Sequence, residues 1–184
     1  MFGMFTVVFR ALWRHVKIDV DEDEEFEEVI DKYCNAGAGT AEALHILVHS
    51  DFCNEDHMVQ MATIFKKLNK LHYSNLFHSL PRTSTTSWLA LPEPWTSLEE
   101  LHLDCWLGNG QLFRWFHNDD IRDVDLHLSF PNLTSLEIEL TCDDYCKVLQ
   151  LPDLRGCERL KSFSLHSDSK VCVSFQYDLK SQVS

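Results

Sequence analysis

Apolar residues recur along the chain with one spacing, apolar-x-x-apolar-x-apolar, which appears six times. The second and third apolar residues of each stretch lie two positions apart, so they would point to the same face of a β-strand. The stretches begin at Trp13, Ala41, Leu68, Leu98, Leu133 and Leu160. Their starts are 28, 27, 30, 35 and 27 residues apart, and a period of about 20 to 50 residues is typical of solenoid proteins.

The intervals between these predicted strands carry helical patterns. Residues 24–34 place Phe26, Val29 and Ile30 on one stripe, and their acidic start suits the positive end of a helix dipole. Further helical segments are predicted from Asn54 or Asp56 to Lys67, over 111–117 and over 143–149. Because strands and helices alternate, neighbouring strands are predicted to be parallel.

Three segments depart from this rhythm. Residues 79–94 hold three prolines and a Thr-Ser-Thr-Thr-Ser stretch, which predicts a loop rather than a helix. The 35-residue interval contains an off-frame match to the strand spacing over 121–126. Either an extra strand forms within 121–128 or this repeat is irregular. Beyond Leu165, the alternation of Val171, Val173 and Phe175 is typical of one more strand.

In a parallel stack, equivalent outward residues line up in columns, because adjacent strands lie about 4.8 Å apart. The central column is predicted to hold Lys17, His45, His72, His102, Glu137 and Ser164. A second column, two residues further along each strand, is predicted to hold Asp19, Leu47, Ser74, Asp104, Glu139 and His166. A third column, two residues earlier, is predicted to hold His15, Ala43, Lys70, Glu100, Ser135 and Ser162. The predicted outer face is polar, mixed in charge and rich in histidine.

The composition narrows the functional classes. With 45% hydrophobic residues the chain can bury a core, and its formal net charge of -13 disfavours nucleic-acid and membrane-surface partners. No run approaches 18 apolar residues, so no membrane-spanning helix is expected. Seven irregularly spaced cysteines in a chain of this length favour reduced thiols, and therefore the cytoplasm or the nucleus.

The histidine column His45, His72 and His102 is the sharpest local feature, and three interpretations of it stay open. The imidazoles are tolerated polar residues, contacts for a partner, or a pH-sensitive or metal-binding strip. Stacked imidazoles repel one another when protonated, so their pKa values should lie below 6.5. A parallel column does not converge on one ion, and Cys142-x-x-x-Cys146 lacks a second ligand pair, so no metal site and no cofactor are predicted.

Motifs for catalysis are missing from the sequence. It contains no nucleophile elbow, phosphate-binding loop, dinucleotide fingerprint or His-Glu-x-x-His. A hydrolase built from scattered Ser, His and Asp would need a pocket that joins residues of different columns. We therefore predict that the chain is not an enzyme.

Two stretches, Leu12–Ile18 and Phe130–Ile138, together with the leucine spacing, resemble the leucine-rich repeats of fungal F-box proteins. The resemblance covers roughly residues 9–166. It implies an α/β solenoid, a ribonuclease-inhibitor-like horseshoe arc of about six irregular repeats, with a parallel sheet on the concave side and helices or loops on the convex side. Residues 1–184 would form one irregular leucine-rich-repeat domain, an incomplete array in which residues 1–12 are the remnant of an upstream module.

The chain departs from that family in two respects. The Asn or Cys that forms a hydrogen-bond ladder in the family is replaced by His49, Leu76, Trp106 and Thr141. The F-box is also absent, because only 12 residues precede Trp13. Docking to a Skp–cullin ligase is therefore expected only if an F-box lies upstream.

These observations predict a protein–protein interaction module, which in an F-box-type adaptor would recognise substrates for ubiquitylation. The concave face would bind a protein, and the acidity of the chain favours a basic one; neither nucleic acid nor membrane is expected. The residues predicted to contact the partner are Lys17, His45, His72, His102, Asp104, Glu137, Glu139 and Ser164. The alternative is a degenerate or truncated repeat fragment without a specific partner.

Overall fold

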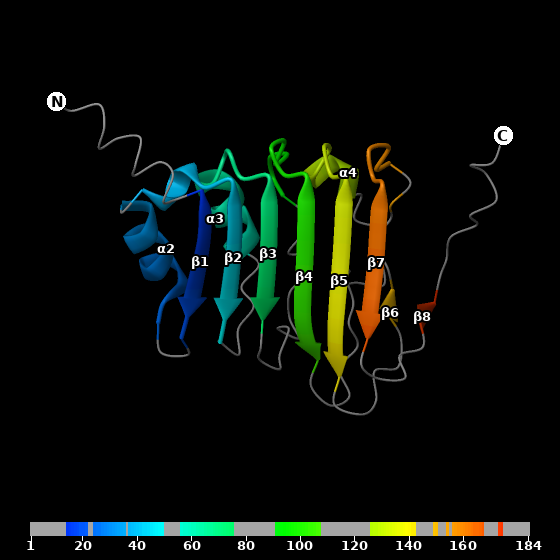
Figure 1. Ribbon diagram of the computed structural model, residues 1–184, viewed down its shortest axis with the longest axis horizontal. Helices are drawn as coiled ribbons and strands as arrows, with labels where there is room; N and C mark the ends of the chain where they lie inside the picture. Colours follow the sequence, from blue (N-terminus) through cyan, green and yellow to red (C-terminus); the bar gives the residue numbers. More distant parts are fainter. Residues whose placement is uncertain are drawn as a thin grey trace.

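The computed structural model contains a six-stranded, all-parallel β-sheet whose strands follow one another in the order β1-β2-β3-β4-β5-β7 (Figure 1). The residues that the structure describes are 14–21, 24–35, 37–49, 56–75, 91–107, 126–142, 149–150, 154, 156–167 and 173–174. The fold is therefore α/β with a parallel sheet, as the alternation of strand and helix patterns predicted. The arrangement is compatible with a solenoid.

The six strands of the main sheet coincide with the six repeated stretches. They are β1 (His15–Val20), β2 (Ala43–Val48), β3 (Lys70–Asn75), β4 (Glu100–Leu107), β5 (Ser135–Cys142) and β7 (Ser162–Ser167). Neighbouring strands pair without a slip, so that Val16, Leu44, Leu71, Leu101, Leu136 and Phe163 form one row across the sheet. A shift of one residue would turn each leucine to the solvent face, which is why the hydrophobic pattern specifies this register.

Helices contribute to the core on the inner face of the sheet. They are α2 (Phe26–Asn35), the 3-10 turn η1 (Ala38–Thr40), α3 (Asp56–Ile64) and the short α4 (Leu126–Ser129). Ile30 of α2 and Met61 of α3 are fully buried in the same cluster as Ile46 and Tyr73 of the sheet. In Figure 1, α3 lies behind β2 and β3, so its apolar side chains cover the inward rows of those strands.

The two long helices lie within or close to the predicted segments: α2 begins two residues after the predicted Glu24 and ends one residue after the predicted Cys34. Gly37 adopts a positive φ of 109° after α2, and its N–H donates to the Cys34 carbonyl at 2.9 Å; this left-handed cap is what glycine permits. The α3 helix ends at Ile64, three residues before the predicted Lys67. A turn replaces its last predicted residues and brings Leu68 back to the core.

One turn recurs before four of the strands. The N–H of the first apolar residue of the repeated pattern donates to the carbonyl three residues earlier, at 3.0 to 3.4 Å. The four pairs are Leu68 with Phe65, Leu98 with Trp95, Leu133 with Phe130 and Leu160 with Cys157. Three of the four residues at the start of this turn are aromatic and buried, so each anchors the chain just before it enters the sheet.

A second hydrogen-bond arrangement joins each strand to the next. The carbonyl of the residue just before a strand accepts two N–H bonds, at 2.8 to 3.1 Å, from the residues that open the following strand. The accepting carbonyls belong to Arg14, Glu42, Asn69, Glu99 and Thr134. Because main-chain amides supply the paired donors in all five joints, the joints repeat although the side chains differ from one strand to the next. At Glu99 the Thr134 hydroxyl also donates to the same carbonyl, at 3.0 Å.

The C-terminal part differs from the predictions. Leu126 begins α4 rather than ending an extra strand, and residues 121–125 lie outside the described part. Strand β8 (Val173–Ser174) pairs with β6 (Leu149–Gln150) in a separate two-stranded sheet and does not extend the main one. Leu149 is thus in a strand and not in the predicted helix over 143–149. The predicted helix over 111–117 and residues 79–90 of the predicted loop also lie outside the described residues, whereas residues 91–94 form neither helix nor strand.

Candidate functional site

The outward side chains of the main sheet form a surface that we call the polar face, defined by the three predicted columns. The strand pairing aligns Lys17, His45, His72, His102, Glu137 and Ser164 in the central column. Asp104 and Glu139 are paired in the next column. All eight residues predicted to contact a partner therefore lie on one face, and their alignment confirms the predicted register.

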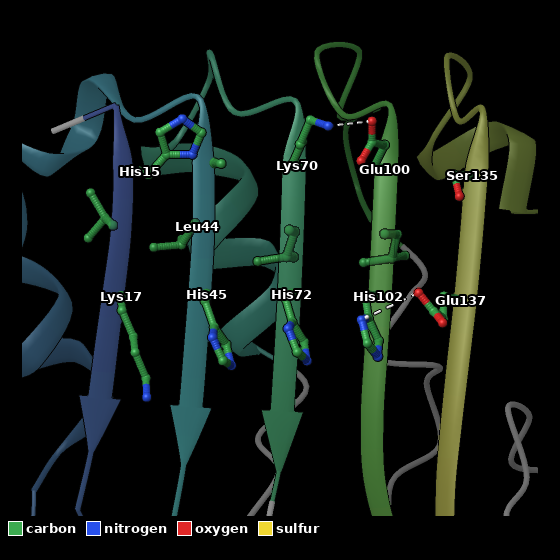
Figure 2. Close-up of a pocket in the computed structure, with 14 residues that line it drawn as sticks. His15, Lys17, Leu44, His45, Lys70, His72, Glu100, His102, Ser135 and Glu137 are labelled. Atoms are coloured by element: carbon green, nitrogen blue, oxygen red, sulfur yellow. Dashed lines mark hydrogen bonds and ion pairs between the residues drawn. The ribbon is translucent and has the colours of Figure 1, made fainter. Parts of the chain in front are cut away.

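The three histidines of the central column stack face to face, as Figure 2 shows. The ring centroids of His45 and His72 are 4.1 Å apart with an interplanar angle of 1°. Those of His72 and His102 are 3.9 Å apart with an angle of 4°. The rings are spaced by the strands that carry them, so the stack is a direct consequence of the in-register parallel sheet.

Burial lowers the pKa of two rings of the stack, His45 and His72. The pKa of His72 falls from 6.5 to about 4, first because the ring is shielded from water and then because His102 and His45 lie beside it. Partial burial also lowers the pKa of His45, with Lys17 and His102 adding to the effect. The predicted direction is confirmed for both residues, but removal of water from the ring contributes more than repulsion between imidazoles.

Ser74 connects the middle of the stack to the neighbouring column. Its hydroxyl donates to Oδ2 of Asp104 at 3.3 Å and lies 3.1 Å from Nε2 of His72. A neutral His72 with its proton on Nε2 can donate to the Ser74 oxygen, which would leave both groups satisfied. Although Ser74 points outward, only 3% of its surface is exposed, because its neighbours on the polar face close over it.

Acidic side chains surround the last histidine of the stack. Nδ1 of His102 lies 3.6 Å from Glu137, and Nε2 lies 3.8 Å from Glu139. Nε2 of His166, on β7, lies 3.5 Å from the other oxygen of Glu137. With Asp104, these carboxylates make the β4–β5 part of the polar face negative.

The two lysines of the polar face lie on β1 and β3. Lys17 is exposed on β1, and Lys70 forms an ion pair of 2.6 Å with Glu100 across β3 and β4 (Figure 2). A depression of about 450 Å³ runs across β1 to β5. Its lining includes Lys17, His45, His72, His102 and Glu137, so five of the eight predicted residues meet in one hollow.

Other candidates from the sequence fall elsewhere. The side chains of Cys142 and Cys146 lie outside the described part of the chain. A smaller group at the far edge of the sheet contains Asp19, Asp21 and His49, with Nε2 of His49 2.8 Å from Asp19. The sequence did not indicate the bridging role of Ser74 or the approach of His166 to Glu137, because side-chain directions within a column depend on the neighbouring strands.

Comparisons with protein-family models, with curated proteins and with solved structures give no match. Within the described residues, every helix is too short or too polar to cross a bilayer.

Proposed function

We propose that the chain is an interaction module of the leucine-rich-repeat type that binds a basic protein segment on its polar face. The observation that supports this most directly is the alignment of three polar columns on the outer face of a sheet whose inner face is filled by the core. Solenoids commonly bind partners on such a surface. The recurring turn and the five main-chain joints further support a repeat architecture.

The charge of the face favours a basic partner. Asp104, Glu137 and Glu139 lie on adjacent strands and keep part of their surface in solvent. Of the nearby cations, Lys70 is already paired with Glu100. An extended segment that carries Lys or Arg could lie across the strands along the depression and place its charges against these carboxylates.

A role in ubiquitylation is a conditional part of this proposal. If the complete protein carries an F-box, the polar face would be the part that recognises substrates, and the F-box would dock to a Skp–cullin ligase. The resemblance of Leu12–Ile18 and Phe130–Ile138 to fungal F-box proteins supports this extension. The binding property itself does not depend on it.

A labelled Arg-Gly repeat peptide provides the test, with a Glu-Gly peptide as its negative control. The variant Asp104→Asn, Glu137→Gln, Glu139→Gln removes three charges from the polar face. Each partly exposed charge contact contributes roughly 0.2–1 kcal/mol, so the variant should bind about three- to a hundredfold more weakly by fluorescence anisotropy. The measurements are made with a chelator present, so that a bound metal ion cannot affect them.

The matched control is Glu25→Gln, Glu28→Gln, Asp31→Asn, which removes three exposed charges on or beside α2. It should bind the peptide like the wild type. Equal weakening of both variants would mean that net charge alone attracts the peptide. If the wild type binds neither peptide, the chain is better described as a repeat fragment without a specific partner.

A further inference from the structure

The cluster around His102 has the composition and spacing of a metal site. One ligand atom from each of His102, Glu137 and Glu139 can be chosen so that all three lie within 4.8 Å of one another. The residues come from two adjacent strands and two columns, so they converge, whereas the stacked histidines of a single column do not.

His102 has a buried nitrogen that lacks a hydrogen-bond partner. Its Nε2 is shielded from solvent and, among the described residues, accepts or donates no hydrogen bond. Glu139 faces this nitrogen, but at 3.8 Å the separation is too long for a hydrogen bond. A buried polar atom without a partner is costly and calls for an explanation such as a bound ion.

The distance between Nε2 of His102 and the Glu139 carboxylate fits two ligands of one ion better than it fits a direct hydrogen bond. Zinc is held at about 2.0–2.2 Å by imidazole nitrogen and carboxylate oxygen, so tetrahedral neighbours lie roughly 3.3–3.6 Å apart. The distance from Nε2 of His102 to Glu139 exceeds that by a few tenths of an ångström. Side-chain rotation alone can make up such a difference.

The third member of the group, Glu137, faces the other nitrogen of His102. Nδ1 lies 3.6 Å from Oε2 of Glu137, and a small rotation of this carboxylate toward the ion would complete the set of three ligands. Glu137 also reaches toward His166, whose Nε2 is 3.5 Å from Oε1. His166 is thus close enough to supply a fourth ligand or to hold Glu137 in place.

We propose that His102, Glu137 and Glu139 bind a divalent transition-metal ion such as Zn²⁺, with His166 as a nearby additional ligand. Imidazole together with carboxylate suits zinc and its neighbours, while Mg²⁺ and Ca²⁺ prefer oxygen ligands throughout. Two carboxylates and a neutral imidazole carry a charge that a divalent cation balances. The ligands are partly exposed, at 25%, 41% and 45% of their side chains, so the ion can enter from solvent.

Calorimetric titration of the full chain with Zn²⁺, without any peptide, tests the site independently of the proposed partner. We expect one tight site in the wild type and at least tenfold weaker binding in His102→Ala and in Glu139→Gln. The isosteric Glu139→Gln change keeps the test valid if His102→Ala disturbs the stack. His45→Ala changes a histidine of the same column that is not one of the three grouped ligands, and it should bind as the wild type does.

Two further measurements separate this site from the alternatives. His49→Ala should leave binding unchanged; a loss would assign the ion to the Asp19, Asp21 and His49 group instead. Cobalt bound through thiolates gives a strong charge-transfer absorption that a histidine–carboxylate site lacks, so that absorption would assign the ion to cysteines. Either result, or wild-type binding no tighter than that of Glu139→Gln, would overturn the proposal while leaving peptide binding in chelator unaffected.

Discussion

The lowered pKa of His72 predicts that the protein loses stability in mild acid. His72 is neutral in the folded chain down to about pH 4, whereas its ordinary pKa is 6.5. The unfolded chain therefore takes up a proton more readily than the folded one. The stabilising effect of the neutral ring is fully present above pH 6.5 and is lost progressively as the pH falls from 6.5 toward 4.

The size of the effect follows from the two pKa values. The full difference between 6.5 and about 4 corresponds to about 3 kcal/mol, at 1.36 kcal/mol per pH unit. His72 is only partly buried, and screening by solvent reduces this figure to roughly 1–2 kcal/mol. Between pH 7 and pH 5 the expected loss is therefore about 1 kcal/mol.

The assay compares urea unfolding of the wild type with that of His72→Gln at pH 7 and pH 5. Glutamine does not titrate and retains a donor for Ser74, so carboxylate effects shared by both proteins cancel. The wild type should lose about 1 kcal/mol more than the variant. His15→Gln, which changes an exposed histidine outside the stack, should behave as the wild type. If the free energy of unfolding falls equally in the wild type and in His72→Gln between pH 7 and pH 5, the lowered pKa of His72 does not contribute to stability.

Two further predictions concern stability and use urea unfolding at pH 7. Leu71→Ala should lower the free energy of unfolding by about 2–5 kcal/mol, because Leu71 is 2% exposed at the centre of the sheet. Lys70→Ala, beside it on the polar face, should lower it by less than about 1 kcal/mol. Similar losses in the two variants would contradict the assignment of inner and outer faces. Leu136→Ala should cost more than Phe163→Ala, because the two residues are paired in register but Phe163 is 36% exposed. The reverse order would mean that Phe163 is covered.

The strands could be predicted because their information is local. Each is marked by two apolar residues that lie two positions apart, preceded by a third apolar residue, and this spacing is visible in a single sequence. The repeat interval then implied the register, since pairing equivalent positions of each repeat turns Leu44, Leu71 and Leu101 to the same side and into one row. The columns of the polar face followed without further assumptions.

Helix ends and the C-terminal pairing could not be predicted from local signals. The pattern of Met58, Met61 and Phe65 continues smoothly to Lys67, yet the chain must turn at 65–67 to enter β3. Leu126 is the last residue of a stretch with strand spacing, yet it begins the short helix α4, which leads into the Phe130 anchor. In both places the geometry of the following strand determines the structure.

The contacts between side chains of the candidate site could not be predicted from the sequence either. The prediction placed the three histidines in one column and indicated only that their protonated rings would repel one another. The neighbouring strand brings Glu137 and Glu139 to opposite nitrogens of His102, and the proposed metal site depends on that approach. Such contacts depend on side-chain rotation across strands, which periodicity does not encode.

The five main-chain joints have a consequence for how such a protein can evolve. Each joint is made by a carbonyl and two amides whatever residues carry them, so a unit can be duplicated or deleted as a block without new side-chain complementarity at the seam. The side chains of the outward residues take no part in these joints, although some of the amides belong to those residues. Specificity can therefore drift one position at a time while the scaffold is inherited unchanged, and the same property would suit the outer face for combinatorial libraries.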